Sequence, residues 1–167
     1  MATWKKIATT DDIVSPTEEF TQNGTTNNWT GAYDSSLSAV GNYYGENIRF
    51  GTAISFVAGK IYCFSSSGWV LADKGTPDHG TRILGVATGT TTTSWPTGNL
   101  LTKGIIKMSS VSGTDAPGKI VYLGDAGVPT ATLPTSTGDI VRPIGYALDT
   151  TNNIMFFDPD KSWVELS

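Results

Sequence analysis

The chain has 167 residues, of which 16% are charged, and its formal net charge is -4. This charged fraction is well below the roughly 25% that is usual for soluble proteins. The lysines are scattered apart from Lys5 and Lys6, so no nucleic-acid partner is expected, because binding to phosphates needs a basic stripe. No run approaches the roughly 20 apolar residues of a membrane span, and no membrane partner is expected either.

Residues 1–50 differ in composition from the rest of the chain. The stretch "TQNGTTNNWTGAYDSSLSAVGNYYGEN" is rich in Asn, Gly, Ser and Thr and carries isolated aromatic residues without a sustained period of two or 3.6. Such a segment cannot bury a core of its own. We therefore predict an extended N-terminal arm over residues 1–50 that contacts neighbouring subunits through aromatic anchors.

Alternating apolar patterns begin near Asn47, and one pattern is stated twice. "GKIYCFSSSGWV" begins at Gly59 and "GKIVYLGDAGVP" at Gly118, an offset of 59 residues, while "ILGVA" and "PIGYA" repeat at an offset of 60. The runs are rich in β-branched and aromatic residues and are separated by Gly, Pro, Ser and Asp turns, which is typical of strands. We predict an all-β domain over 51–167, a small β-sandwich or barrel built from two pseudo-repeats, about 51–115 and 116–167.

A single pseudo-repeat without a disulfide or metal is too small to be more than marginally stable by itself. The two pseudo-repeats should therefore share one core. Pro129 and Pro143 lie within apparent strands, which are expected to be edges or bulged, because proline cannot donate to the ladder. The residues predicted to fill the buried face are Ile61, Cys63, Val70, Leu84, Val86, Ile120, Tyr122, Val128, Ile144 and Tyr146.

Residues able to carry catalysis are scarce. His79 is the single histidine and Cys63 the single cysteine, which excludes the usual zinc patterns, and Cys63 lies in an apolar run typical of a buried thiol. Asp158 and Asp160 have the spacing of two calcium ligands, but the Gly and distal Glu of a calcium loop are missing. We expect no enzyme activity, no catalytic residues, no metal and no cofactor.

Five tryptophans are many for a small single-core protein. We expect Trp69 and Trp163 in the core. Trp4 and Trp29 lie in a segment without a core, and tryptophan is enriched at interface hot spots, so these two are predicted anchors on a partner or sister subunit. Trp95 lies in the Thr-rich stretch "TGTTTTSWPTG", which reads either as a contact tip or as an inert loop.

The opening "MATWKKIATTDDI" resembles the starts of small structural proteins of tailed bacteriophages, especially those of aquatic and cyanobacterial phages. The succession of "GKIVYLGDAGVPT", "RPIGYALDT" and "IMFF" is similar to the β-rich capsid decoration (cement) and fibre proteins of such phages. The resemblance implies a non-enzymatic virion protein made in the host cytoplasm. As a decoration protein, and by family likeness a homotrimer, it would bind and stabilise the lattice of the major capsid protein or contact other virion proteins.

The alternative is a tail or head fibre protein that reads a glycan on the host surface, with Tyr43, Tyr44 and the loop at Trp95 as recognition elements. For either role, the predicted partner-binding residues are Trp4, Lys5, Lys6, Ile7, Trp29, Tyr33, Tyr43, Tyr44 and Trp95.

Overall fold

The computed structural model describes residues 19–22, 25–28, 35–50, 55–90, 99–113 and 116–167, with side chains from Leu37 onward. Contacts divide the chain into two compact units, Met1–Ser36 and Leu37–Ser167. The second unit is called the body below.

The N-terminal unit contains a short antiparallel hairpin. Strand β1 (Glu19–Gln22) pairs with β2 (Thr25–Asn28), with Glu19 opposite Asn28 and Gln22 opposite Thr25. The intervening sequence is Asn-Gly, the pair preferred in two-residue hairpin turns. The predicted arm thus includes paired strands as well as linking sequence.

The body begins earlier than the sequence predicts. After the 3₁₀ helix η1 (Ser35–Ser38), strand β3 (Tyr43–Ile48) pairs with β7 (Leu100–Lys107) in the main sheet. The predicted boundary at residue 50 therefore moves to Ser36–Leu37. The polar residues Glu46 and Asn47 obscured this strand, and both lie on its exposed stretch.

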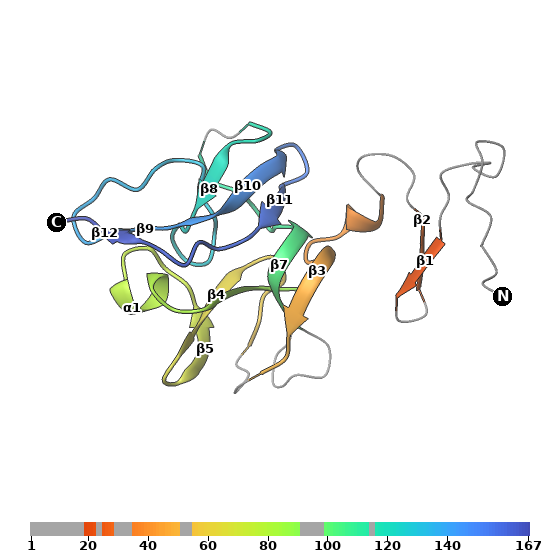
Figure 1. Ribbon diagram of the computed structural model, residues 1–167, viewed down its shortest axis with the longest axis horizontal. Helices are drawn as coiled ribbons and strands as arrows, with labels where there is room; N and C mark the ends of the chain where they lie inside the picture. The colour runs from red at the N-terminus through yellow and green to blue at the C-terminus, as the bar shows by residue number, and fades with distance from the viewer. Residues whose placement is uncertain (1–18, 23–24, 29–34, 51–54, 91–98, 114–115) are drawn as a thin grey trace, which may run out of the picture. The chain divides into compact units, whose positions relative to one another are not determined.

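The body is all-β, as predicted, and its antiparallel sheet curls into a half-barrel (Figure 1). The main sheet has eight strands in the order β5-β4-β6-β7-β11-β10-β8, with β3 also paired to β7. A separate two-stranded sheet joins β9 and β12, and a short α-helix, α1 (Pro77–Gly80), follows β5. The other strands are β4 (Ile61–Ser65), β5 (Gly68–Leu71), β6 (Leu84–Ala87), β8 (Ile120–Tyr122), β9 (Ile140–Val141), β10 (Pro143–Asp149), β11 (Ile154–Phe157) and β12 (Val164–Glu165).

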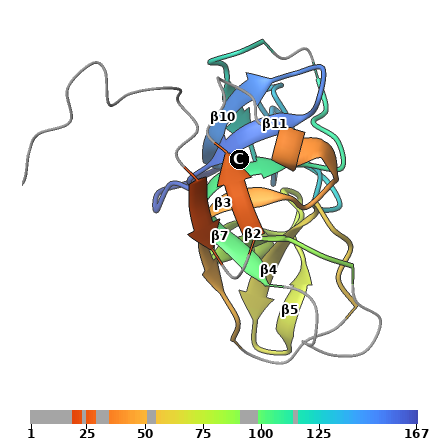
Figure 2. The same ribbon diagram turned by 90° about the vertical axis from the view of Figure 1, so that its right-hand side faces the viewer.

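The two pseudo-repeat segments pair their strands in the same order. In the first, β5 pairs with β4, β4 with β6 and β6 with β7. In the second, Thr130 bridges to β8, β8 pairs with β10 and β10 with β11. The register also repeats, since Ile61 lies opposite Val86 and Ile120 lies opposite Tyr146. Strands β7 and β11 join the two segments, and Figure 2 shows β4 and β5 on one side of them and β10 on the other.

The main core is shared between the segments and consists of fully or nearly fully buried side chains from both. Its members are Ile61, Cys63, Ala72, Leu84, Val86, Leu101, Ile106, Met108, Val121, Leu123, Ile144, Ala147, Met155 and Phe157. A second, smaller cluster lies within the first segment and contains Phe56, Tyr62, Trp69, Ala87 and Leu100. The first segment is therefore buried on both faces of its strands.

The predicted core is correct for the first segment and largely wrong for the second. Of the ten predicted residues, Ile61, Cys63, Leu84, Val86 and Ile144 are buried, while Val70, Tyr122 and Val128 are partly buried. Ile120 and Tyr146 are 39% and 48% exposed. In β8 the buried residue is Val121, the neighbour of Ile120, so this strand of the second segment turns the opposite face to the core.

A row of glycines crosses the sheet where this change of face occurs. Gly45 lies opposite Gly104, Gly104 opposite Phe157, and Phe157 opposite Gly145. The three glycines have φ values of +148°, +145° and +142°, a region that L side chains rarely adopt. A Cβ on Gly104 would overlap the carbonyl oxygen of Tyr44. Glycine is needed here because neighbouring backbones approach closely at the bend.

The sequence expectations for Pro143, Trp69 and Trp163 have different outcomes. Pro143 lies inside the sheet, between β8 and β11, and its register with β8 is irregular between Pro143 and Gly145, which agrees with the predicted bulge. Trp69 is fully buried, and its Nε1 donates to the Phe50 carbonyl at 2.6 Å. Trp163 is 43% exposed, so the expectation that it is a core residue is wrong.

Candidate functional site

Most of the predicted partner-binding residues fall where the structure gives no side-chain description. Tyr43 and Tyr44 lie within the body. The remaining predicted positions, Trp4, Lys5, Lys6, Ile7, Trp29, Tyr33 and Trp95, lie outside the described residues.

Both of these tyrosines are on β3 and half-buried. Tyr43 packs against the main core, and its hydroxyl accepts a hydrogen bond from Nδ2 of Asn47 at 2.9 Å. Tyr44 lies opposite Ile105 of β7. Tyr43 therefore contributes to the packing of the body, and its position on β3 follows from the pairing with β7.

Cys63 is a buried thiol in β4. Burial raises its pKa to about 11 and outweighs the opposing effect of the nearby Arg82 guanidinium, so the thiol is protonated at neutral pH. Nδ1 of His79 is also buried and accepts or donates no hydrogen bond within the described residues. A nucleophilic cysteine needs a lowered pKa and a hydrogen-bonded base, whereas the pKa of Cys63 is raised and Nδ1 of His79 has no hydrogen-bond partner among the described residues.

The side chain that organises the C-terminal segment is Arg142. It is 5% exposed, its Nε donates to the carbonyl oxygen of Asp160 at 2.8 Å, and its Nη1 donates to the carbonyl oxygens of Gly80 and Arg82. The guanidinium also lies 5.7 Å from the ring centre of Trp163. Desolvation by burial lowers its pKa. Through these bonds Arg142 ties the segment after β11 to helix α1.

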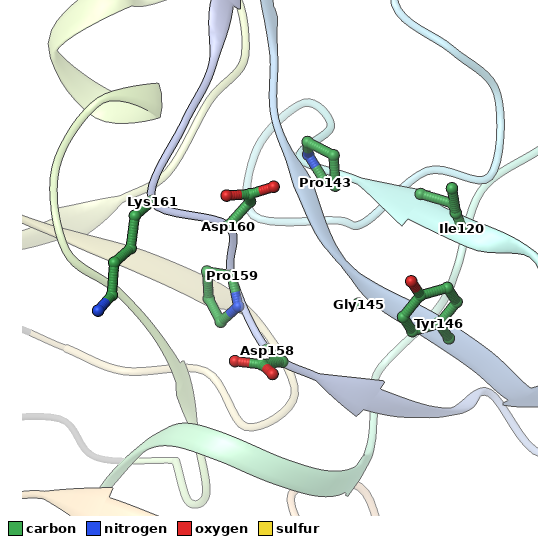
Figure 3. Close-up of a pocket in the computed structure, with 8 residues that line it drawn as sticks. All are labelled: Ile120, Pro143, Gly145, Tyr146, Asp158, Pro159, Asp160 and Lys161. Carbon is green, nitrogen blue, oxygen red and sulfur yellow. The ribbon is translucent and has the colours of Figure 1, made fainter.

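A hollow of about 490 Å³ lies on the outer side of β8 and β10, between these strands and the segment that follows β11 (Figure 3). The segment is fixed along β10 by two backbone bonds, from Asp158 N to Ile144 O and from Asp160 N to Pro143 O, both 2.9 Å. The hollow is lined by Ile120, Pro143, Gly145, Tyr146, Asp158, Pro159, Asp160 and Lys161.

Two carboxylates border this hollow. Oδ2 of Asp158 forms an ion pair with Nζ of Lys103 at 2.8 Å, which raises the pKa of Lys103. Oδ1 of Asp160 accepts the backbone N–H of Ser162 at 3.0 Å and its Oγ–H at 2.9 Å, and these bonds lower the pKa of Asp160. Asp160 is therefore ionised at neutral pH, whereas a general acid needs a raised pKa.

The hollow combines an exposed aromatic ring, rigid proline surfaces and ionised hydrogen-bond acceptors. These groups suit reversible binding of a small polar ligand. The sequence drew attention to Asp158 and Asp160 by their spacing but placed Tyr146 and Ile120 in the core. The glycine and proline in "RPIGYAL" break the regular alternation of β10, and this is the signal from which the outward position of Tyr146 could have been inferred.

The described residues form neither a metal centre nor a membrane-spanning helix. Among the described residues, no group of three or more His, Cys, Asp or Glu side chains is placed to hold a metal ion. Within the same residues, no helix is long and apolar enough to cross a membrane.

Comparison with known proteins found no match: no protein-family model, no curated protein and no solved structure is similar to this chain at a significant level.

Proposed function

We propose that the chain is a non-enzymatic structural protein of a tailed-phage particle, a capsid decoration protein that binds the lattice of the major capsid protein. The observation that carries this proposal is the division of the chain into a body with its own core and a separate N-terminal unit. In this arrangement the folded body lies on the particle surface, while the N-terminal unit contacts the lattice through Trp4, Lys5, Lys6 and Ile7.

The two charged side chains Arg142 and Lys74 of the body form internal contacts, which supports a structural role. Arg142 donates hydrogen bonds to backbone carbonyls, and Lys74 forms ion pairs with Asp139 and Asp125 at 2.7 and 3.4 Å. These groups hold loops and strands together. The resemblance of the opening residues and of the repeated turn pattern to phage structural proteins supports the particle assignment, and the homotrimer is part of the same proposal.

The test is attachment to particles that lack the protein. We expect deletion of residues 1–36 to leave a cooperatively folding body and to abolish binding to such particles, measured by quantitative mass spectrometry after sedimentation. Trp4→Ala together with Lys5→Ala and Lys6→Ala in the full chain is the length-matched variant and should also reduce occupancy. Normal occupancy of a folded deletion variant would refute the proposed docking by the N-terminal unit.

A second candidate is a fibre protein that binds a host glycan, and the exposed ring of Tyr146 beside two carboxylates favours it. Copy number separates the two roles, because decoration proteins cover a capsid in hundreds of copies and fibres are few. Counting the protein against the major capsid protein in purified particles decides between them.

A further inference from the structure

The hollow on β8 and β10 is bordered by polar groups that can still form hydrogen bonds. Oδ2 of Asp158 is engaged by Lys103 and Oδ1 of Asp160 by Ser162, and the backbone N–H of Lys161 also bonds to the Asp160 carboxylate. Each carboxylate oxygen has more than one lone pair, so both groups can accept further hydrogen bonds. The Tyr146 hydroxyl forms no hydrogen bond with any described residue, and Tyr146 is 48% exposed. Two acceptors and one hydroxyl that can donate or accept thus border one small hollow.

The remaining surface of the hollow is apolar and rigid. Pro143 and Pro159 have fixed φ angles, and Ile120, opposite Tyr146 in the ladder, is 39% exposed. Figure 3 shows Pro159 between the two carboxylates and across the hollow from the Tyr146 ring. A ligand that presents C–H groups to this ring and hydroxyls to the carboxylates would match both parts of the lining.

The charges around the hollow limit the ligand class further. The carboxylates of Asp158 and Asp160 are balanced by Lys103, which is paired with Asp158, and by Lys161 on the rim. An anionic ligand would meet the two carboxylates, and a metal ion would find fewer than three acidic or imidazole ligands among the described residues. A neutral molecule with many hydroxyls fits this balance.

We propose that this hollow binds a neutral pyranose unit of a saccharide, with one sugar face stacked on Tyr146 and sugar hydroxyls donating to Asp158 and Asp160. Its volume lies within the roughly 300–1,000 Å³ of small-ligand sites. The site is independent of the proposed capsid role, because all its residues lie in the body and none in residues 1–36. It also differs from the glycan site predicted at Tyr43, Tyr44 and Trp95.

The experiment is a titration of the full chain with methyl pyranosides of glucose, galactose, mannose and N-acetylglucosamine, followed by saturation-transfer NMR and protein chemical shifts. Methyl glucuronide is the anionic comparison. We expect at least one neutral pyranoside to bind with Kd on the order of 1 mM, an affinity typical of a shallow, open site. Tyr146→Ala should weaken that binding at least about tenfold, the equivalent of about 1.4 kcal/mol.

Two further variants distinguish the contribution of the aromatic ring to binding from an effect on folding. Tyr146→Phe keeps the stacking face and should bind within about threefold of the wild type, whereas Tyr146→Leu keeps apolar bulk without the ring and should lose binding like Tyr146→Ala. Phe50→Ala, at an aromatic residue that is 57% exposed and outside the hollow, is the control and should bind normally. Thermal melting establishes that each variant is folded.

Three outcomes would overturn the proposal. They are no binding of any neutral pyranoside at the solubility limit of the probe, unchanged binding by folded Tyr146→Ala and Tyr146→Leu, or preferential binding of methyl glucuronide. None of these outcomes bears on capsid attachment, which the deletion of residues 1–36 tests separately.

Discussion

The two pseudo-repeat segments pair their strands in the same way but bury different strand faces. In the first segment Ile61 and Val86, which lie opposite each other, are fully buried in the main core. Their counterparts in the second segment, Ile120 and Tyr146, also lie opposite each other but are exposed and line the hollow. A repeated backbone ladder therefore fixes which residues are neighbours without fixing which strand face is buried.

The difference has a local cause in the backbone. Gly85 and Gly145 are at matching places in the two segments, but only Gly145 has a positive φ, +142°. At that point the register of β10 with β8 is irregular, and the alternation of side chains changes face. The first segment, by contrast, buries both faces, because a second cluster that includes Tyr62 and Trp69 covers the side away from the main core.

Substitution of the two matching glycines should give the largest contrast. A Cβ at Gly145 would overlap the carbonyl oxygen of Phe156 on β11, and φ is strained for any L side chain. Since the overlap is with backbone, β10 and β11 must separate to relieve it. We expect Gly145→Ala to lower the free energy of unfolding by about 4 kcal/mol or to prevent folding. Urea denaturation followed by tryptophan fluorescence measures the loss.

Gly85→Ala is the matched control. A Cβ at Gly85 would lie 3.0 Å from Cβ of Leu100, a side-chain atom, and φ is not positive there. We expect a loss of about 1 kcal/mol, the cost of mild overpacking. Equal losses for the two variants would mean that the segments bend alike and that the change of face has another cause.

The matching isoleucines test the difference in burial directly. Ile61→Ala removes a side chain that is fully buried and leaves a cavity in the main core, so we expect a loss of about 3 kcal/mol. Ile120→Ala removes one that is 39% exposed, and we expect a loss below about 1 kcal/mol. Both losses are measured from the midpoints of urea denaturation, provided that the dependence of the unfolding free energy on denaturant is the same in each variant. A costly Ile120→Ala would indicate that this face is covered in the folded protein.

These contrasts also explain which parts of the fold could be predicted from the sequence. Strand positions follow from β-branched and aromatic runs between turn residues, and the repeat offsets of 59 and 60 residues correspond to the observed register of Ile61 with Val86 and Ile120 with Tyr146. The face that each strand buries could not be read in the same way. In "IYCF" and "IVYL" consecutive residues are all apolar, so the period of two gives no direction, and a shift of one residue exchanges the faces.

The candidate site could be predicted only in part, for the same reason. The spacing of Asp158 and Asp160 is visible in the sequence, but the hollow that they border depends on Tyr146 pointing outward. That orientation depends on the bend at Gly145 and on Arg142, which binds the Asp160 carbonyl and thereby positions the segment after β11. Both are long-range properties of the folded sheet.

A smaller effect concerns the ion pair that links the segments. Nζ of Lys74, after β5, contacts Oδ2 of Asp139, before β9, at 2.7 Å, and the two side chains are 19% and 8% exposed. Asp139→Asn would leave the ammonium of Lys74 with a weaker, neutral acceptor in a mostly buried position. We expect the free energy of unfolding to fall by about 2 kcal/mol at pH 7, measured by urea denaturation.

Asp125→Asn is the matched control, because Asp125 contacts the same ammonium at 3.4 Å but is 71% exposed, and its loss should cost below about 0.5 kcal/mol. The pH dependence of stability distinguishes the two variants further. The hydrogen bond to Asp139 is the main cause that raises the pKa of Lys74 above its ordinary 10.5. Its contribution to stability is fully present below pH 10.5 and is lost as the pH rises through that raised pKa. Asp139→Asn should therefore flatten the alkaline decline in stability more than Asp125→Asn does, and an equal decline in both would show that Asp139 does not hold this lysine in solution.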